Sequence, residues 1–370
     1  MASHFLRDLG QILFRNRDQH AIPSMDGALG PNDRLDALAP VGEPLPAPDC
    51  HTLGPDGALY VSSGHQVWRL EGDGFTRRTE VARFEGQAGG LAFHPDGRLL
   101  VCVEGAGLAA VGAQGRLDWL SEVRGEKLGS LTSVVATPQG TIFMSEGSTR
   151  HEPHLWYRDL MEKNRAGRIL SCGPGLEGVE ILAQGLAYPH GLALSEGARE
   201  LWFTEAWQHR VMKARIEGRG LGGITPVIPN LPGYPARLGP ARDGGFWLAI
   251  FAMRTHLTEL VLREDEYRHE MMRTIEPDLW IRPALSSSGH YLEPLQGGSV
   301  KKLGIQKPWA PPRSYGLVVR IDEEGEAIES LHSRVGGRYH GVTSAGDTRE
   351  GLIVLSKGND RVLLRPRQTQ

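Results

Sequence analysis

A hairpin pattern that recurs six times constrains the fold of this chain more than any other feature of its sequence. Each copy is a short apolar strand, a turn and a second apolar or aromatic strand. The copies begin at Cys50, Gly90, Ser133, Gly191, Arg237 and Gly341. Self-similarity of this kind is typical of architectures in which each repeat forms one structural unit.

The turns explain why each copy reads as a hairpin. In the first three copies the turn is Pro-Asp-Gly or Pro-Gln-Gly, and glycine there can adopt the positive φ that tight turns require. Further strand-like segments follow most copies, for example QVWRL and EVARF after the first. Four strands in each repeat of about 40 residues predict an all-β fold, the six-bladed β-propeller.

A closed ring must join its first and last blades, because an open edge leaves backbone groups unpaired. The chain stops one strand short of a complete last blade after DRVLLRP, and residues 33–41 precede the first copy without a blade of their own. We therefore expect residues 33–370 to form the propeller, closed by residues 33–41. Residues 1–32 would be an extension containing a short helix, with one apolar stripe formed by Phe5, Leu6, Leu9, Ile12 and Leu13.

Two repeats contain long insertions after their second strands, at about residues 147–165 and 253–314. Loops after second strands emerge on one face of a propeller, so both insertions should cover the same mouth of the channel. Long loops in a compact domain are usually functional, which predicts a lid over a small-molecule pocket. Candidate substrate-binding residues on this lid are Arg150, His151, Trp156, Trp280 and Tyr291.

Composition excludes several classes of partner. The formal net charge is -3, and acidic and basic residues are mixed without basic runs, so we expect no nucleic acid partner. The three cysteines are widely spaced and odd in number, which favours reduced thiols. No apolar run approaches the roughly 20 residues of a membrane span, and the first residues lack the apolar core of a signal peptide, which predicts a cytoplasmic location.

Several motifs resemble the strictosidine synthase-like propellers. They are Ser148-Thr149-Arg150 before an insertion that ends at Gly167-Arg168-Ile169-Leu170, Tyr188-Pro189-His190-Gly191, and Gly233-Tyr234-Pro235 before Gly245-Phe246-Trp247. That group is similar in turn to the gluconolactonases and paraoxonases, which hydrolyse lactones and esters with a calcium ion at the top of the channel. The resemblance covers most of the chain from about Pro48 onward.

The resemblance also implies calcium ligands at the starts of the innermost strands, which this sequence replaces. The family has a Glu, two Asn and an Asp, whereas the corresponding places here hold Asp49, Thr132 or Ser133, His190, and Ala236 beside Arg237. Only the first is a good hard-oxygen ligand for calcium. We therefore expect no calcium and no other cofactor. The glutamate of strictosidine synthase falls near His340, so its condensation reaction is not expected either.

Side chains from different blades should converge at this mouth, where we expect innermost strands to begin near Asp49, Ala88, Thr132, His190, Ala236 and His340. We predict that His190 and His340 are an acid–base pair supported by Asp49, with Arg237 facing developing negative charge. A metal site formed by Asp49, His190 and His340 is a second possibility. Ser133, Glu146 and Glu205 are further candidate substrate-binding residues beside the mouth.

The sequence leaves three functions open. The first is a hydrolase of a lactone or ester, which the acid–base residues favour. The second is a metal-independent lyase or condensing enzyme, and the third is a propeller that binds a small molecule without catalysis, because a fold alone does not establish a function.

Overall fold

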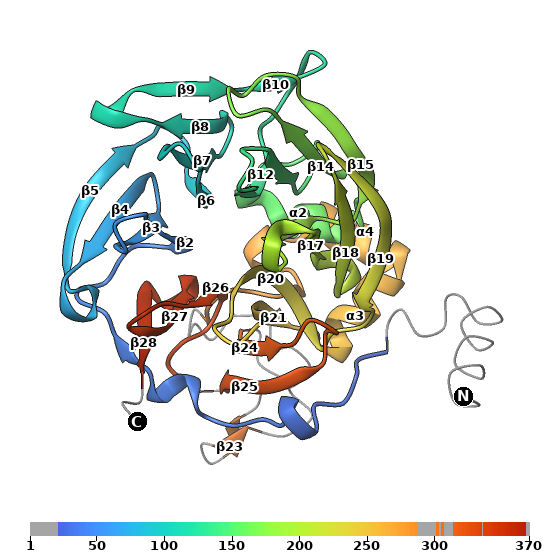
Figure 1. Cartoon of the computed structure of the whole chain (residues 1–370). Helices are drawn as coiled ribbons and strands as arrows, with labels where there is room; N and C mark the ends of the chain where they lie inside the picture. The colour runs from blue at the N-terminus through green and yellow to red at the C-terminus, as the bar shows by residue number, and fades with distance from the viewer. Residues whose placement is uncertain (1–20, 288–300, 303–304, 307–313, 335, 368–370) are drawn as a thin grey trace, which may run out of the picture.

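The computed structural model describes residues 21–287, 301–302, 305–306, 314–334 and 336–367. These residues form six four-stranded antiparallel sheets arranged in a ring around a central channel (Figure 1). The prediction of a six-bladed propeller is confirmed. The apolar helical stripe expected between Phe5 and Leu13 lies outside the described residues.

The sheets follow one another along the chain, each with its first strand innermost. Blade one contains β2 (Pro48–Leu53), β3 (Leu59–Ser63), β4 (Gln66–Glu71) and β5 (Arg77–Arg83); blade two contains β6 (Ala88–Phe93), β7 (Leu99–Val103), β8 (Gly107–Val111) and β9 (Leu117–Leu120). Blade three contains β12 (Leu131–Ala136), β13 (Ile142–Glu146), β14 (Gly167–Cys172) and β15 (Glu180–Leu186); blade four contains β16 (Pro189–Leu194), β17 (Glu200–Glu205), β18 (Arg210–Glu217) and β19 (Gly220–Ile228). Blade five contains β20 (Gly233–Pro240), β21 (Phe246–Met253), β24 (Gly316–Ile321) and β25 (Ala327–Ser333). Two short ladders lie outside the blades, β10 (Glu122–Val123) with β11 (Glu126–Lys127) and β22 (Lys301–Lys302) with β23 (Ile305–Gln306).

Blade six is assembled from both ends of the described chain. Its strands β26 (Val342–Asp347), β27 (Gly351–Ser356) and β28 (Arg361–Pro366) are completed by β1 (Ala39–Pro40), which pairs antiparallel with β28. The ring is thus closed by the N-terminal segment, as the sequence predicts. Just before β1, Leu35 is fully buried in the largest apolar cluster. Its packing fastens the closing segment to the last two blades.

The two insertions contain the α-helices of the described chain. The third-blade insertion forms α2 (Trp156–Met161), and the fifth-blade insertion begins with α3 (His256–Arg263) and α4 (Asp265–Thr274). The insertions touch each other, since the rings of Tyr157 and Trp280 lie 5.9 Å apart edge to face. An ion pair of 3.3 Å between Lys163 and Asp265 adds a second contact. We refer to the described parts of the two insertions together as the lid, whose helices lie on one face of the ring in Figure 1.

Glycines at the hairpin turns have the predicted backbone conformation, for example Gly97 with φ of +92° and Gly140 with φ of +88°. Among the described residues, no helix has the length and apolar character needed to cross a membrane.

Candidate functional site

A bulge at the start of each innermost strand directs side chains into the channel. The strand register shifts between Pro48 and Cys50 in β2, and corresponding shifts occur near the starts of the other five innermost strands. A bulge leaves the inserted residue out of the ladder and re-aims its side chain. The residues inside these shifts that line the cavity are Asp49, Gly89, Thr132, His190, Arg237 and Thr343.

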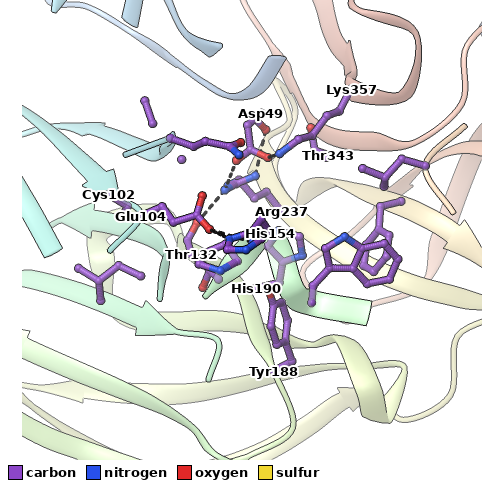
Figure 2. Close-up of a pocket in the computed structure, with 18 of the residues that line it drawn as sticks. Asp49, Cys102, Glu104, Thr132, His154, Tyr188, His190, Arg237, Thr343 and Lys357 are labelled. Carbon is purple, nitrogen blue, oxygen red and sulfur yellow. Dashed lines mark hydrogen bonds and ion pairs between the residues drawn. The ribbon is translucent and has the colours of Figure 1, made fainter. Parts of the chain in front are cut away.

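These residues surround a cavity of about 250 Å³ under the lid, shown in Figure 2. One wall is aromatic. It consists of Trp156 on the lid with Tyr188, Trp207 and Phe251 from blades four and five. The rings interlock, with Tyr188 stacked on Trp207 at 4.4 Å and Trp156 edge-on to Phe251 at 5.4 Å. This wall can hold the apolar part of a small ligand.

The opposite part of the cavity holds a charged cluster of Asp49, Arg237 and Lys357 (Figure 2). An Asp49 carboxylate oxygen lies 2.6 Å from Nη2 of Arg237, and the other lies 2.7 Å from Nζ of Lys357. Burial alone would raise the pKa of the Asp49 carboxyl, but the two neighbouring cations outweigh burial and hold its pKa well below the usual value. The carboxylate therefore stays ionised, and the cluster carries one net positive charge.

The two cations of this cluster differ in what they can offer a ligand. Arg237 is nearly enclosed and also donates to the backbone carbonyls of Asp49 at 2.9 Å and Thr132 at 2.7 Å. Lys357 is one-quarter exposed and donates to Asp49. An ammonium group has three N–H donors, so Lys357 can also donate to a ligand.

His190 lies beside this cluster, between Tyr188 and Phe251. Burial and then the positive charge of Arg237 lower its pKa to about 3, so the ring is neutral at ordinary pH. Its Nδ1 is buried and has no hydrogen-bond partner in the described part of the chain. Gly191 makes this placement possible, because a Cβ there would lie 2.5 Å from the carbonyl oxygen of Ala236 on the next innermost strand.

A histidine and a carboxylate form a separate pair on the cavity wall. His154 belongs to the third-blade insertion, and Glu104 directly follows β7 in blade two. Nδ1 of His154 lies 2.6 Å from a carboxylate oxygen of Glu104, which also accepts the backbone N–H of His154 at 3.0 Å. The two bonds connect the lid to blade two at the cavity.

The structure does not bring His340 to the cavity, contrary to the expected His190–His340 pair. Its Nδ1 lies 2.9 Å from the Ser314 hydroxyl and its Nε2 lies 3.0 Å from the carbonyl oxygen of Arg334. Both ring nitrogens are therefore occupied, which also removes His340 from the expected metal trio. The reason is register: β26 begins at Val342, and its bulge presents Thr343 to the cavity.

Three polar candidates on the strands also lie outside the cavity lining and have structural partners. Glu146 is buried against Arg168 at 2.5 Å, and Glu205 pairs with Arg210 and accepts the backbone N–H of Ala187. Ser133 accepts the backbone N–H of Leu192 across the blade boundary. These contacts hold neighbouring strands and blades together.

Of the candidate residues on the lid, one lines the cavity and the other described ones do not. Trp156 lines the cavity, whereas Trp280 is fully buried behind it and donates to the carbonyl oxygen of Ile275. Arg150 bonds Asn164, and His151 bonds Glu162 at 2.7 Å, both away from the cavity lining. Tyr291 lies outside the described residues.

Sequence reasoning missed Lys357 and Glu104. Each is the first residue after a second strand, Lys357 after β27 and Glu104 after β7. Glu146 and Glu205, the candidates at second-strand ends, are still inside their strands and paired with the third strand. Choosing the residue that directly follows each second strand, instead of the last residue inside it, could have found the two cavity residues.

The charged cluster does not fit a calcium ion. Calcium prefers six to eight oxygen ligands. Here Asp49 is the innermost-strand carboxylate that lines the cavity, and it is paired with two cations. The Arg237 guanidinium also takes the carbonyl oxygen of Thr132. The guanidinium thus satisfies oxygen atoms that a metal ion would need.

Comparison with known proteins gives the same family as the motifs. The strictosidine synthase family model matches residues 133–219. Protein STRICTOSIDINE SYNTHASE-LIKE 13 from Arabidopsis thaliana is 30% identical over 251 residues, which are 67% of this chain and 56% of that protein. The adipocyte plasma membrane-associated protein of Danio rerio is 26% identical over 171 residues, covering 45% of this chain and 41% of that protein. The chain spans about half the length of the curated relatives it matches.

Solved structures agree on the fold. A gluconolactonase from Xanthomonas campestris superposes with a TM-score of 0.58 at 13% identity, over 89% of each chain. Regucalcin from Agrobacterium tumefaciens, a calcium-binding protein, has a TM-score of 0.57 at 14% identity, over 89% of this chain and 94% of its own. The resemblance to the strictosidine synthase-like and gluconolactonase propellers is confirmed.

Proposed function

We propose that this strictosidine synthase-like propeller is an enzyme that hydrolyses a small lactone or ester without a metal ion. The observation that carries the proposal is the charged cluster, in which a partly exposed ammonium group is held in the cavity by a buried carboxylate. In the gluconolactonases, which this chain resembles, a calcium ion at the top of the channel would polarise the substrate carbonyl. Here Lys357 supplies a positive charge in the corresponding part of the channel.

The charged cluster supports stabilisation of an oxyanion. Water attack on an ester carbonyl moves negative charge onto the carbonyl oxygen, and a preorganised donor aimed at that oxygen lowers the barrier. Lys357 can donate to this oxygen while keeping its bond to Asp49. Arg237 fixes the carboxylate and hence the ammonium group, so little reorganisation accompanies the reaction.

His190 suits a hydrogen-bonding role better than the role of a general base. The ideal general base has a pKa near the working pH, and burial beside Arg237 lowers the pKa of His190 to about 3. A neutral imidazole has one N–H donor and one lone pair, so His190 can orient the substrate or the attacking water. The expected acid–base role of His190 is revised in this proposal accordingly.

The size of the cavity favours a small substrate. Ligand pockets are commonly about 300–1,000 Å³, and the cavity here is about 250 Å³. The aromatic wall, on the other hand, suits a flat or apolar group next to the reacting carbonyl.

A panel of γ- and δ-lactones and short aryl esters tests the proposal, with release of acid followed in weakly buffered solution containing chelator. We expect turnover of at least one class and saturation by the substrate. Binding without turnover across the whole panel would instead support the non-catalytic reading of the same cavity.

A further inference from the structure

The proposed hydrolysis needs a group that takes a proton from water, and the charged cluster does not supply one. Asp49 is held by two cations. His190 lies between the rings of Tyr188 and Phe251, and burial and then the charge of Arg237 lower its pKa to about 3, which is too low for a general base. His154 is different, because its side chain is about half exposed at 49% and still lines the cavity. It therefore stays in contact with water that reaches the reacting centre.

The contacts of His154 set its orientation. Glu104 accepts from both the ring Nδ1 and the backbone N–H of His154. A proton on Nδ1 leaves the lone pair on Nε2, and no hydrogen bond occupies Nε2 within the described part of the chain. The side chain of Glu104 is only 10% exposed, so the carboxylate is shielded from bulk water and holds the ring firmly.

The other charged groups around this pair are few. Glu152, on the same insertion, has a carboxylate oxygen 3.8 Å from Nδ1 of His154, and its side chain is 49% exposed. Asp49, Arg237 and Lys357 line the same cavity, and together they carry one net positive charge. The cavity lining thus contains both a cationic cluster and a histidine–carboxylate pair.

We propose that His154, oriented by Glu104, is the general base of this enzyme, an inference that rests on the proposed hydrolase function. Nε2 of His154 takes a proton from water as the water oxygen bonds to the carbonyl carbon. The carbonyl electron pair moves onto oxygen, where Lys357 stabilises it. When the tetrahedral species collapses, the C–O bond to the leaving alkoxide breaks and the His154 imidazolium returns the proton to that oxygen. Water is consumed and a hydroxy acid, or an acid and an alcohol, is released.

In this scheme Glu104 is a positioning residue. It keeps the proton on Nδ1 and stabilises the imidazolium that forms during the reaction. It makes no contact with the substrate in the proposal. Its removal should therefore lower kcat and leave KM nearly unchanged, with the Tm of the variant close to that of the wild type. A loss of folding would instead lower the Tm.

The test compares three variants on a substrate that the wild-type enzyme hydrolyses. His154→Ala should lower kcat by about 10²- to 10⁴-fold, the usual contribution of a positioned base. Because the ring is half exposed, added imidazole should restore part of the lost rate. Glu104→Gln should lower kcat by about 10²-fold through loss of orientation. The matched control is Glu152→Gln, which removes a carboxylate 3.8 Å from the same ring nitrogen and should change kcat by less than about twofold.

The outcomes separate this inference from the proposed function. An active wild type with a His154→Ala variant that keeps at least a third of its rate overturns the role of His154 while hydrolysis stands. Loss of rate in His154→Ala that imidazole does not restore, together with a lowered Tm, assigns His154 to structure and also overturns it. Equal losses in Glu104→Gln and Glu152→Gln overturn the positioning role. A wild type that turns over no lactone or ester overturns both proposals.

Discussion

Replacing the two cations of the charged cluster one at a time should separate stability from activity. Arg237→Met keeps an unbranched apolar side chain and removes the guanidinium, which donates to Asp49 and to two backbone carbonyls at 2.6–2.9 Å. The Asp49 side chain is only 12% exposed, so water replaces these bonds poorly. Breaking a buried ion pair by removing one partner costs about 3–5 kcal/mol of unfolding free energy, and we expect a loss of that size.

Lys357→Met should behave in the opposite way. Its ammonium group is one-quarter exposed and Asp49 keeps Arg237, so the unfolding free energy should fall by about 1 kcal/mol or less. Its loss from the proposed oxyanion site should lower kcat by about 10²- to 10³-fold. Urea unfolding followed by tryptophan fluorescence measures the first quantity, and initial rates on a confirmed substrate measure the second.

A cost of less than about 1 kcal/mol for Arg237→Met would show that the guanidinium does not support the cluster. A Lys357→Met variant less stable than Arg237→Met would contradict the assigned roles of the two cations. Arg237→Lys provides an internal check. It keeps the charge and loses the forked geometry, so its stability should lie between those of the wild type and Arg237→Met.

Three further predictions follow from the same site. The pKa of His190 is about 3 in the folded protein and about 6.5 when unfolded, so the unfolded chain binds one more proton between these values and stability falls as the pH drops through that window. His190→Gln should reduce the slope of the unfolding free energy against pH near pH 5 by up to about 1.4 kcal/mol per pH unit. Urea unfolding at several pH values measures this slope. An unchanged slope would contradict a buried, neutral His190 ring. Calcium at 1 mM should leave the Tm of chelator-treated protein unchanged, whereas a site with a Kd of about 10 µM would add about 2.7 kcal/mol and visibly raise it. Trp156→Ala should raise KM at least tenfold with a small change in Tm, because the ring lines the cavity and is only partly buried. Calorimetric titration with a substrate measures the affinity. An affinity equal to that of the wild type would show that Trp156 does not contribute to binding.

The repeat was enough to predict the ring and its closure, because turn residues and alternating apolar segments are local signals. The cavity residues were harder, since a bulge at each innermost strand decides which side chain faces the channel. In blade one the residue inside the bulge is Asp49, as expected. In blade six it is Thr343, and a shift of three residues led to His340 instead. Side-chain direction alternates along a strand, so even a one-residue error in register moves a residue out of the site.

The pairing of His154 with Glu104 could not be predicted from the sequence for a different reason. The two residues are fifty positions apart, on an insertion of blade three and on the turn after β7 in blade two. Only the packing of the lid against the ring brings them to 2.6 Å. The third-blade insertion is not part of the repeat, so the repeat pattern carries no information on its contacts. Those contacts depend on tertiary structure.

The most direct test of the central claim is the rate of lactone or ester hydrolysis in excess chelator, measured for the wild type and for Lys357→Met. Metal-independent catalysis by the charged cluster predicts a wild-type rate that chelator does not change. It also predicts a rate at least about 10²-fold lower in Lys357→Met, with the variant still folded. A wild-type rate that disappears with chelator and returns with calcium would contradict the account, as would a Lys357→Met variant with the full wild-type rate.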